Sequence, residues 1–340
     1  MRLSGCKDRS YRYLVTGISG FLGSQIVKKV ISSKKYRDGR IQIYGICRDK
    51  KKLSELIAEP ESDRFFVKEA DIRDREAVKA AIHEPVDYII HCAAPTVSSY
   101  MVSHPVETAD SIVMGTHNML ELARQFQLKS MVYLSSMEVY GSVMDTGQAR
   151  KENELGDVSL EASRSCYPLG KRMAEHYCHI YQQEYGVPVK IARLAQVFGK
   201  GVRKEDNRVY MQFARSVLEE RDIILKTAGE SMGNYCASED AVRAVFTILK
   251  KGDNGEVYNV VNEKNTMRIR EMAELAAGCA ESGKVGVRAE TEDSGKNGYA
   301  PDTGLRMSGE KLRELGWMPQ KNLVQMYQDV IGELNGFIQP

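Results

Sequence analysis

The stretch Tyr13-Leu-Val-Thr16-Gly17-Ile-Ser-Gly20-Phe21-Leu22-Gly23 joins a short apolar run to a helical pattern through three glycines. Strand, tight turn and helix are therefore expected in succession. In such a turn Gly17 permits the bend, Gly20 lets the backbone approach a pyrophosphate, and Gly23 lets the helix pack closely on the strand. The start of the helix adds N–H groups and the positive end of its dipole. The stretch predicts dinucleotide binding, and the alternative is a glycine-rich turn without a ligand.

Composition limits the remaining possibilities. The 340 residues exceed one hydrophobic core, so a second lobe is expected. A net charge of +2 gives no electrostatic reason to bind nucleic acid or an anionic membrane. Neither a leader-like start nor an apolar run of membrane-spanning length is found, and a cytoplasmic protein is expected. The seven cysteines lack a C-x-x-C pair and are expected to be reduced, and no metal site is expected.

Strand-like and helix-like segments alternate along the chain. Helices are expected at residues 51–58, 75–83, 105–127, 168–185, 210–220, 241–250, 270–280, 309–315 and from 323, and a charged loop at 291–297. Strands are expected at residues 41–46, 64–68, 86–91, 130–135, 189–194, 223–226 and 257–261. This alternation predicts an α/β fold with a Rossmann-like, doubly wound parallel sheet. We expect a dinucleotide-binding domain of residues 1–198 and 234–262, and a smaller C-terminal α/β substrate-binding lobe of 199–233 and 263–340.

Tyr167 and Lys171 are the candidates for chemistry. They lie four residues apart in a helical segment, which places both side chains on one face. An ammonium beside a phenol favours the phenolate and lowers the tyrosine pKa, so Tyr167 can act as a general acid or base. The alternative is two ordinary helix-surface residues, because Tyr-x-x-x-Lys often occurs by chance. Its place after the glycine turn and after Ser135-Ser136 favours the catalytic interpretation.

Six motifs occur in an order that resembles the extended short-chain dehydrogenases/reductases. They are Thr16-Gly-Ile-Ser-Gly-Phe-Leu-Gly23, Asp71-Ile-Arg-Asp74, His91-Cys-Ala-Ala94, Ser135-Ser-Met-Glu-Val-Tyr-Gly141, Tyr167-x-x-x-Lys171 and Lys311-Leu-Arg-Glu-Leu-Gly-Trp-Met-Pro319. The similarity is to the NAD-dependent epimerase/dehydratase branch, whose usual substrates are nucleotide-linked sugars. It covers nearly the whole chain and specifies the superfamily better than the reaction.

The resemblance implies roles for individual residues. Tyr167 would be the catalytic acid/base, Lys171 would bind the nicotinamide ribose, and Ser136 would hydrogen-bond the reacting sugar oxygen. The pyrophosphate of the cofactor would be held by Gly17, Gly20, Phe21, Leu22 and Gly23. Its adenine would be held by Asp71 and Ile72, and the neighbouring wall of the cofactor site would be formed by Ala93 and Ala94. The shared chemistry is hydride transfer between a sugar carbinol carbon and nicotinamide, coupled to proton transfer through the tyrosine.

Three departures from the family pattern bear on the substrate and the reaction. The 4,6-dehydratases carry an Asp-Glu pair where this chain has Met137-Glu138, and a thioether cannot donate the proton for water loss. Glu138 remains a candidate acid, base or orienting group. Ile112 replaces an asparagine, which puts a water relay in doubt. Gly233 replaces an arginine that binds the substrate diphosphate in the family. Either the substrate of this chain lacks a diphosphate, or other cations hold it. The candidate cations are Arg193, Lys200, Arg203, Lys204, Arg208 and Arg215.

The cofactor choice depends on the end of the second strand. NAD-specific members place an acid there, whereas Ile46-Cys47-Arg48-Asp49 offers an arginine that can pair with a 2′-phosphate. Arg48 thus favours NADP, the family majority favours NAD, and a shift of one residue to Asp49 reverses the inference. Arg48 can also be a solvated loop cation.

These observations leave three hypotheses. The first is an epimerase of a nucleotide-linked sugar that works through a keto intermediate. The second is a net NADPH-dependent reductase of a sugar or other carbonyl. The third is a non-catalytic, cofactor-binding regulatory protein, which the intact Ser136, Tyr167 and Lys171 argue against. The resemblance also implies a homodimer formed through the helices near 105–127 and 168–185.

Overall fold

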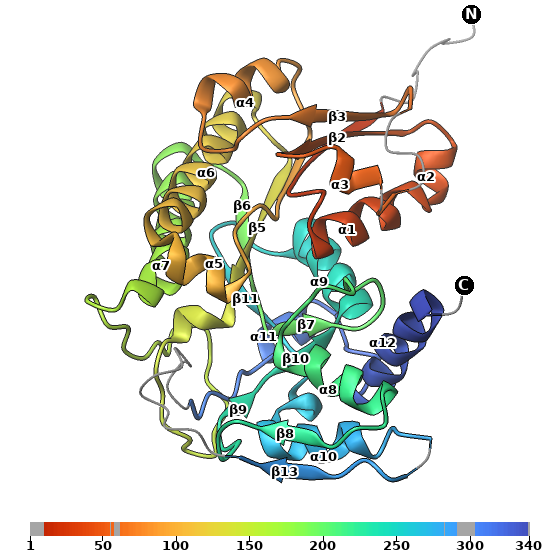
Figure 1. Ribbon diagram of the computed structural model, residues 1–340. Coiled ribbons are helices and arrows are strands. Elements are labelled where there is room, and N and C mark those ends of the chain that lie inside the picture. The colour runs from red at the N-terminus through yellow and green to blue at the C-terminus, as the bar shows by residue number, and fades with distance from the viewer. Residues whose placement is uncertain (1–9, 55, 58–61, 282, 291–302, 339–340) are drawn as a thin grey trace, which may run out of the picture. The chain divides into compact units, whose positions relative to one another are not determined.

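The computed structural model describes residues 10–338 except 55, 58–61, 282 and 291–302 (Figure 1). By its internal contacts the chain divides into two compact units. The first comprises Met1–Ser135, Ser159–Ala192 and Val245–Val257, and the second comprises Ser136–Val158, Arg193–Ala244 and Tyr258–Pro340. The charged loop expected at 291–297 lies outside the described residues, as does Cys6, and the six described cysteines are free thiols.

A seven-stranded sheet forms the centre of the fold, in the order β11-β6-β5-β4-β1-β2-β3. Its strands are β1 (Tyr11–Thr16), β2 (Ile41–Cys47), β3 (Phe65–Glu69), β4 (Tyr88–His91), β5 (Ser130–Ser136), β6 (Val189–Leu194) and β11 (Val257–Val260). Strand β1 pairs in parallel with both β2 and β4, so the chain winds outward to β3 and then returns to the other side of β1. The predicted Rossmann-like α/β fold is confirmed. Its topological switch point lies between β1 and β4, where open α/β sheets bind ligands.

Helices cover both faces of this sheet in Figure 1. On one side lie α1 (Phe21–Ile31), α2 (Lys34–Arg37) and α3 (Lys51–Ser54), and on the other lie α4 (Arg75–Ala81), α6 (Pro105–Phe126) and α7 (Cys166–Tyr185), with α5 (Ser98–Ser103) preceding α6. One buried apolar cluster joins the sheet to α4, α6 and α7, and it includes Leu14, Ile89, Ile112, Met119 and Cys178. Gly170 of α7 faces Ile112 of α6, and a Cβ on Gly170 would lie 3.4 Å from the Ile112 side chain, an ordinary packing distance.

The second unit is built from short strand pairs and helices. The pairs are β7 (Gln196–Phe198) with β10 (Tyr235–Ala237), β8 (Ile223–Leu225) with β13 (Val287–Ala289), and β9 (Met232–Gly233) with β12 (Met267–Arg268). The helices are α8 (Val209–Leu218), α10 (Ile269–Ala277), α11 (Glu310–Glu314) and α12 (Leu323–Ile338), and α9 (Ser238–Lys251) adds residues to both units. The core is aromatic: Phe198 stacks on Tyr210 at 4.3 Å between ring centres and meets Tyr235 and Tyr327 edge-on.

The observed elements differ from the expected ones mainly at their ends. The helix expected at 51–58 ends at Ser54, and residues 55 and 58 lie outside the described residues. Helix α7 begins at Cys166 rather than at residue 168, and α9 begins at Ser238 rather than at residue 241. Among the residues that the structure describes, none of the helices combines the length and the apolar character that crossing a membrane requires.

A buried lysine makes the stability of the first unit depend on pH. Lys190 at the start of β6 is 4% exposed, and its Nζ donates to Ser130 Oγ at 2.8 Å and to the Pro188 carbonyl at 3.2 Å. Ser130 Oγ in turn donates to the Leu249 carbonyl at 2.7 Å. Burial lowers the pKa of Lys190 to about 8. The folded state therefore releases this proton more readily than the unfolded state does.

We expect Lys190 to make folding more favourable as the pH rises from about 8 toward the unfolded-state value near 10.4, because only the unfolded chain then binds the proton. Over that range the free energy of unfolding of the native protein should gain roughly 2 kcal/mol relative to Lys190→Met. The measurement is urea unfolding of both proteins at several pH values. Lys28→Met, which removes an exposed charge, controls for net charge, and a difference between native and Lys190→Met protein that stays flat with pH would contradict the prediction.

Candidate functional site

The turn between β1 and α1 has the conformation that its glycines predict. Gly17 adopts a φ of +67°, a value that favours glycine, and its N–H donates to the Ile46 carbonyl at 2.9 Å. Gly20 is the N-cap of α1, where it gives no side-chain hydrogen bond, and the first turn of α1 holds no acidic residue. The start of α1 therefore offers positive dipole to an anion without competition from a carboxylate.

The three glycines differ in what a side chain would meet. A Cβ on Gly23 would lie 2.2 Å from the Gly17 carbonyl oxygen, and one on Gly17 would lie 2.9 Å from Ala93 Cα. A Cβ on Gly20 would have the Gly17 carbonyl oxygen, at 3.0 Å, as its one neighbour within 4 Å. Packing inside the protein thus requires Gly17 and Gly23. Gly20 instead leaves an open space at the helix start, and this fits a cofactor pyrophosphate.

Charged side chains gather beyond β2 and β3. The Asp71 carboxylate accepts hydrogen bonds from Arg73 Nη2 at 2.6 Å and from Arg73 Nε at 3.0 Å. Arg73 Nη1 also forms an ion pair with Glu107 at 3.4 Å. The pKa of Asp71 is lowered mainly by its hydrogen bond to Arg73 and further by the charge of Arg48. The exposed Arg48 is therefore close enough to Asp71 to act on it electrostatically. Asp71, the residue expected at the adenine, is therefore already paired with Arg73.

The wall after β4 is tied to the glycine turn. The N–H groups of Cys92 and Ala93 both donate to Thr16 Oγ1 at 3.2 Å. The close approach of Gly17 to Ala93 lies directly beside this contact. Beyond the end of β3, the Ile72 carbonyl accepts a hydrogen bond from the side-chain amide of Asn118 at 2.8 Å, which fixes Ile72 to α6.

Tyr167 and Lys171 lie on the first turns of α7 and are 7% and 3% exposed. Lys171 Nζ is 5.8 Å from the centre of the Tyr167 ring and 4.7 Å from the centre of the Tyr133 ring, and it donates to the Leu134 carbonyl at 2.7 Å. The ammonium is thus held in the interior between strand β5 and the phenol. A cation in this position stabilises negative charge on a nearby oxygen more than one in water does.

Glu175 is a neighbour that the sequence analysis did not single out. It is one helical turn beyond Lys171, is 4% exposed, and accepts the hydroxyl of Ser135 at 2.5 Å. Two buried contacts from α7, through Lys171 and Glu175, therefore fix the end of β5 directly before Ser136. The spacing Tyr167-x-x-x-Lys171-x-x-x-Glu175 on one helix face was the available signal.

Four predicted residues belong to the second unit: Ser136, Glu138, Arg193 and Arg208. Ser136 Oγ accepts the N–H of Glu138 at 3.2 Å and so caps the short 3-10 helix Met137–Tyr140. Arg193 is 4% exposed, and its Nη1 donates to the Glu152 carbonyl at 2.6 Å. Arg208 pairs with Asp206 through Nη2 at 2.5 Å. The roles expected for these residues stay predictions, and an anion on Arg208 would share it with Asp206.

Gly233 is explained by its own surroundings. A Cβ there would lie 2.1 Å from the hydroxyl oxygen of Tyr235, a fully buried side chain of the second unit. An arginine at this position would have to displace that tyrosine. The departure from the family pattern at Gly233 is therefore coupled to the packing of Tyr235.

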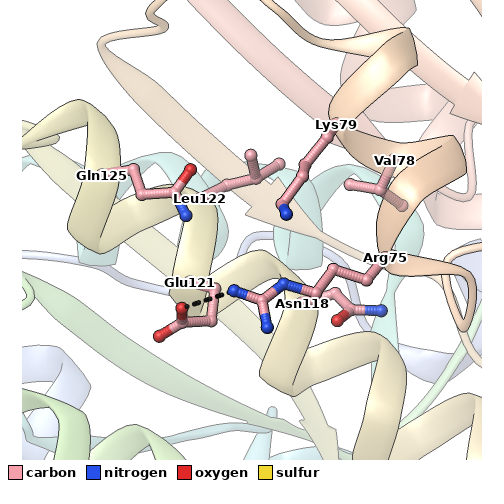
Figure 2. A pocket seen from close by; sticks show the side chains of 7 residues that line it. All are labelled: Arg75, Val78, Lys79, Asn118, Glu121, Leu122 and Gln125. Carbon is pink, nitrogen blue, oxygen red and sulfur yellow. Dashed lines mark hydrogen bonds and ion pairs between the residues drawn. The ribbon is translucent and has the colours of Figure 1, made fainter.

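A separate pocket is lined by side chains of α4 and α6, as Figure 2 shows. Its lining residues are Arg75, Val78, Lys79, Asn118, Glu121, Leu122 and Gln125. An ion pair 3.2 Å long joins two of these residues, from Arg75 Nη2 to Glu121 Oε2 (Figure 2). None of the predicted catalytic or cofactor residues lines it.

The sequence profile of the NAD dependent epimerase/dehydratase family matches residues 13–261. The chain is 29% identical to UDP-glucuronic acid decarboxylase 6 of Arabidopsis thaliana over 262 residues, which are 77% of this chain and 72% of that protein. It is 27% identical to dTDP-D-glucose 4,6-dehydratase of Homo sapiens over 311 residues, 91% of this chain and 85% of that protein.

Among solved structures, UDP-glucose 4-epimerase of Thermotoga maritima, determined with UDP-glucose, matches with a TM-score of 0.81. The match covers 96% of this chain and 100% of that chain at 22% identity. At this identity the likeness is one of fold. The three proteins carry out different reactions, so similarity to them leaves the reaction of this chain to be argued from its residues.

Proposed function

We propose that this chain, which belongs to the NAD dependent epimerase/dehydratase family, epimerises a nucleotide-linked sugar through a keto intermediate. Membership makes it an NAD(P)-dependent enzyme of the extended short-chain dehydrogenase/reductase type. The observation that carries the proposal is the buried Tyr167 and Lys171 pair on α7, which lies against the end of β5.

The cofactor position in this proposal uses the first unit. Gly17, Gly20, Phe21, Leu22 and Gly23 hold the pyrophosphate, and the open space at Gly20 supports that assignment. Asp71 and Ile72 contact the adenine, and Ala93 and Ala94 form the neighbouring wall of the cofactor site. Lys171 binds the nicotinamide ribose. When bound, NAD(P) supplies the hydride acceptor and donor.

The protein side chains move the proton. Tyr167, as phenolate, takes the hydroxyl proton while the sugar carbinol carbon becomes a carbonyl, and it returns that proton when the hydroxyl forms again. The Lys171 ammonium favours the phenolate, and Ser136 donates a hydrogen bond to the reacting oxygen. A planar ketone can be reduced on either face, so its reorientation between the two steps inverts the carbon. In this proposal Arg193 and Arg208 bind substrate, and Arg208 is shared between the substrate and Asp206.

Met137 is the reason to prefer epimerisation over dehydration. Elimination of water needs a proton donor near the leaving hydroxyl, and a thioether has none. Glu138, the next residue, remains a candidate acid, base or orienting group. The proposal therefore differs from the reaction in the name of the human relative, and a dehydratase would need Glu138 to act as the donor.

A homodimer formed through α6 and α7 is part of the proposal. These helices expose the large apolar side chains Met114, Met173 and Tyr185, which are 48%, 41% and 48% accessible in the single chain. Exposed apolar groups on two adjacent helices suit a subunit contact. Size-exclusion chromatography with light scattering gives the mass in solution.

The decisive experiment combines cofactor and product analysis. Denatured protein is examined by mass spectrometry for co-purified NAD or NADP, and native protein is then incubated with UDP-glucose, UDP-glucuronic acid and dTDP-glucose. An epimerase gives a product of unchanged mass without net consumption of NAD(P)H, and a dehydratase gives a product lighter by one water. Oxidation of NADPH supports the reductase alternative. Cofactor binding without turnover of any nucleotide sugar or carbonyl compound supports the non-catalytic alternative.

Arg48 gives a specific prediction about cofactor choice. Arg48→Ala should weaken NADP(H) binding by about tenfold and NAD(H) binding by less than about twofold, because only NADP presents a 2′-phosphate to the guanidinium. Isothermal titration calorimetry measures both affinities, and Arg37→Ala, which removes another exposed arginine, is the control. Tightly held NAD, together with equal affinities in Arg48→Ala and native protein, would show that Arg48 reads no phosphate and would strengthen the case for a self-recycling epimerase.

A further inference from the structure

His91, the last residue of β4, lies among three elements of the first unit and is 1% exposed. Its Nδ1 is 2.7 Å from Thr16 Oγ1 at the end of β1, and its Nε2 is 3.3 Å from Thr116 Oγ1 on α6. Neither the sequence motifs nor the proposed reaction gives this side chain a role. One of its two contacts nevertheless reaches β1, the strand that leads into the glycine turn.

The hydrogen atoms of this network can be assigned from their partners. Thr16 Oγ1 accepts two backbone N–H groups, those of Cys92 and Ala93, so its own hydrogen is donated to His91 Nδ1. Thr116 Oγ1 donates to the Ile112 carbonyl at 2.7 Å, so it accepts from His91 Nε2. Both contacts require the same neutral tautomer, with the proton on Nε2.

The surroundings keep the ring neutral. Burial, and to a lesser extent the positive charge of Lys171, lower the pKa of His91 to about 3. The ring stacks on Tyr133 with 5.6 Å between ring centres. A protonated imidazole would carry hydrogen on both nitrogens, and Thr16 would then lose the acceptor that orients its hydroxyl.

We propose that His91 is a positioning residue of the cofactor site, which orients the Thr16 hydroxyl so that it holds Gly17 and Ala93 in their observed places. The inference rests on the proposed cofactor position. Thr16 links the two walls of that site, because it directly precedes Gly17 and its Oγ1 accepts a hydrogen bond from the N–H of Ala93. The imidazole fixes both to α6 through Thr116.

Two substitutions separate the orienting role from simple filling of space. In His91→Asn the amide oxygen can occupy the position of Nδ1 and accept from Thr16, whereas His91→Phe keeps a stacked ring without any acceptor. Titration calorimetry with NAD(H) and NADP(H) should show affinity within about threefold of native for His91→Asn and weaker by about tenfold or more for His91→Phe. Native affinity in His91→Phe, or equal weakening in both variants, would overturn the role of His91.

The tautomer is tested without any ligand. Nitrogen-15 NMR of the cofactor-free native protein, with the His91 signals assigned by their loss in His91→Asn, should show a neutral ring protonated on Nε2 between about pH 6 and pH 8. A ring protonated on Nδ1, or a charged ring, would overturn the inference even if His91→Phe does not fold. Failure of the native protein to bind either cofactor would instead refute the proposed function and the cofactor-site role together, while the tautomer would still report on the network.

Discussion

Tyr167→Phe should lower turnover of the nucleotide-sugar substrate by about 10²- to 10⁴-fold, the range that loss of a general acid/base commonly costs. The phenol is 7% exposed and adjoins the Lys171 ammonium, so removal of its oxygen deletes the proton acceptor but leaves the ring packing intact. Cofactor affinity should change by less than about threefold, because the cofactor contacts proposed for α7 belong to Lys171. Steady-state assays and titration calorimetry on the same preparation measure both quantities.

Tyr177→Phe is the matched control. It removes a phenolic oxygen ten residues farther along α7, where the ring meets His117 edge-on. Turnover in this variant should stay close to native. If Tyr167→Phe also retained native turnover on an identified substrate, another group would have to carry the proton, and the acid/base assignment would be wrong.

The long helices and strands could be predicted from the sequence because their apolar side chains recur with a clear period. Alternating strand-like and helical segments gave the order of β1 to β6, and they gave α6 and α7 nearly to their observed ends. The elements that the sequence did not indicate are short, such as α5, with six residues, and β10, with three. In segments of this length, tertiary contacts rather than periodicity decide the conformation.

The cofactor turn and the Tyr167 and Lys171 pair were predictable because each is a local pattern. His91 belonged to a quoted motif but was given no role of its own, because the partners of a polar residue in an apolar strand are not visible in the sequence. Glu175 shares a helix face with Tyr167 and Lys171, but its contact with Ser135 is likewise not visible there. The partners of His91 are Thr16, 75 residues away, and Thr116, 25 residues away. Arg193 was chosen for its charge alone, and the structure adds that its guanidinium is buried and donates to the Glu152 carbonyl, so its role as a substrate ligand stays a prediction.

Substitutions in the glycine turn give the second large effect, and we expect Gly23→Ala and Gly20→Ala to have different consequences. Gly23→Ala places a methyl group 2.2 Å from the Gly17 carbonyl oxygen, a contact with backbone that no rotamer change can relieve. Either α1 moves away from β1 or the turn changes shape. We expect a loss of roughly 3 kcal/mol in the free energy of unfolding and a loss of cofactor affinity of about 100-fold or more.

Gly20→Ala should behave differently. Its methyl group meets the Gly17 carbonyl oxygen at 3.0 Å and otherwise points into open space, so the cofactor-free protein should lose less than about 1 kcal/mol. Cofactor affinity should still fall by about tenfold or more, because the methyl group occupies the place proposed for the pyrophosphate. Urea unfolding without ligand, followed by calorimetric titration with NAD(H) and NADP(H), separates the two effects.

Gly332→Ala on α12 is the control for the substitution itself. Nothing lies within 4 Å of the added Cβ, and alanine favours a helix over glycine by about 1 kcal/mol, so this variant should be native or slightly more stable. Native cofactor affinity in Gly20→Ala would refute the placement of the pyrophosphate at this turn. Native stability in Gly23→Ala would mean that α1 can shift without cost. Close packing of α1 on β1 would then not be the reason that position 23 requires glycine.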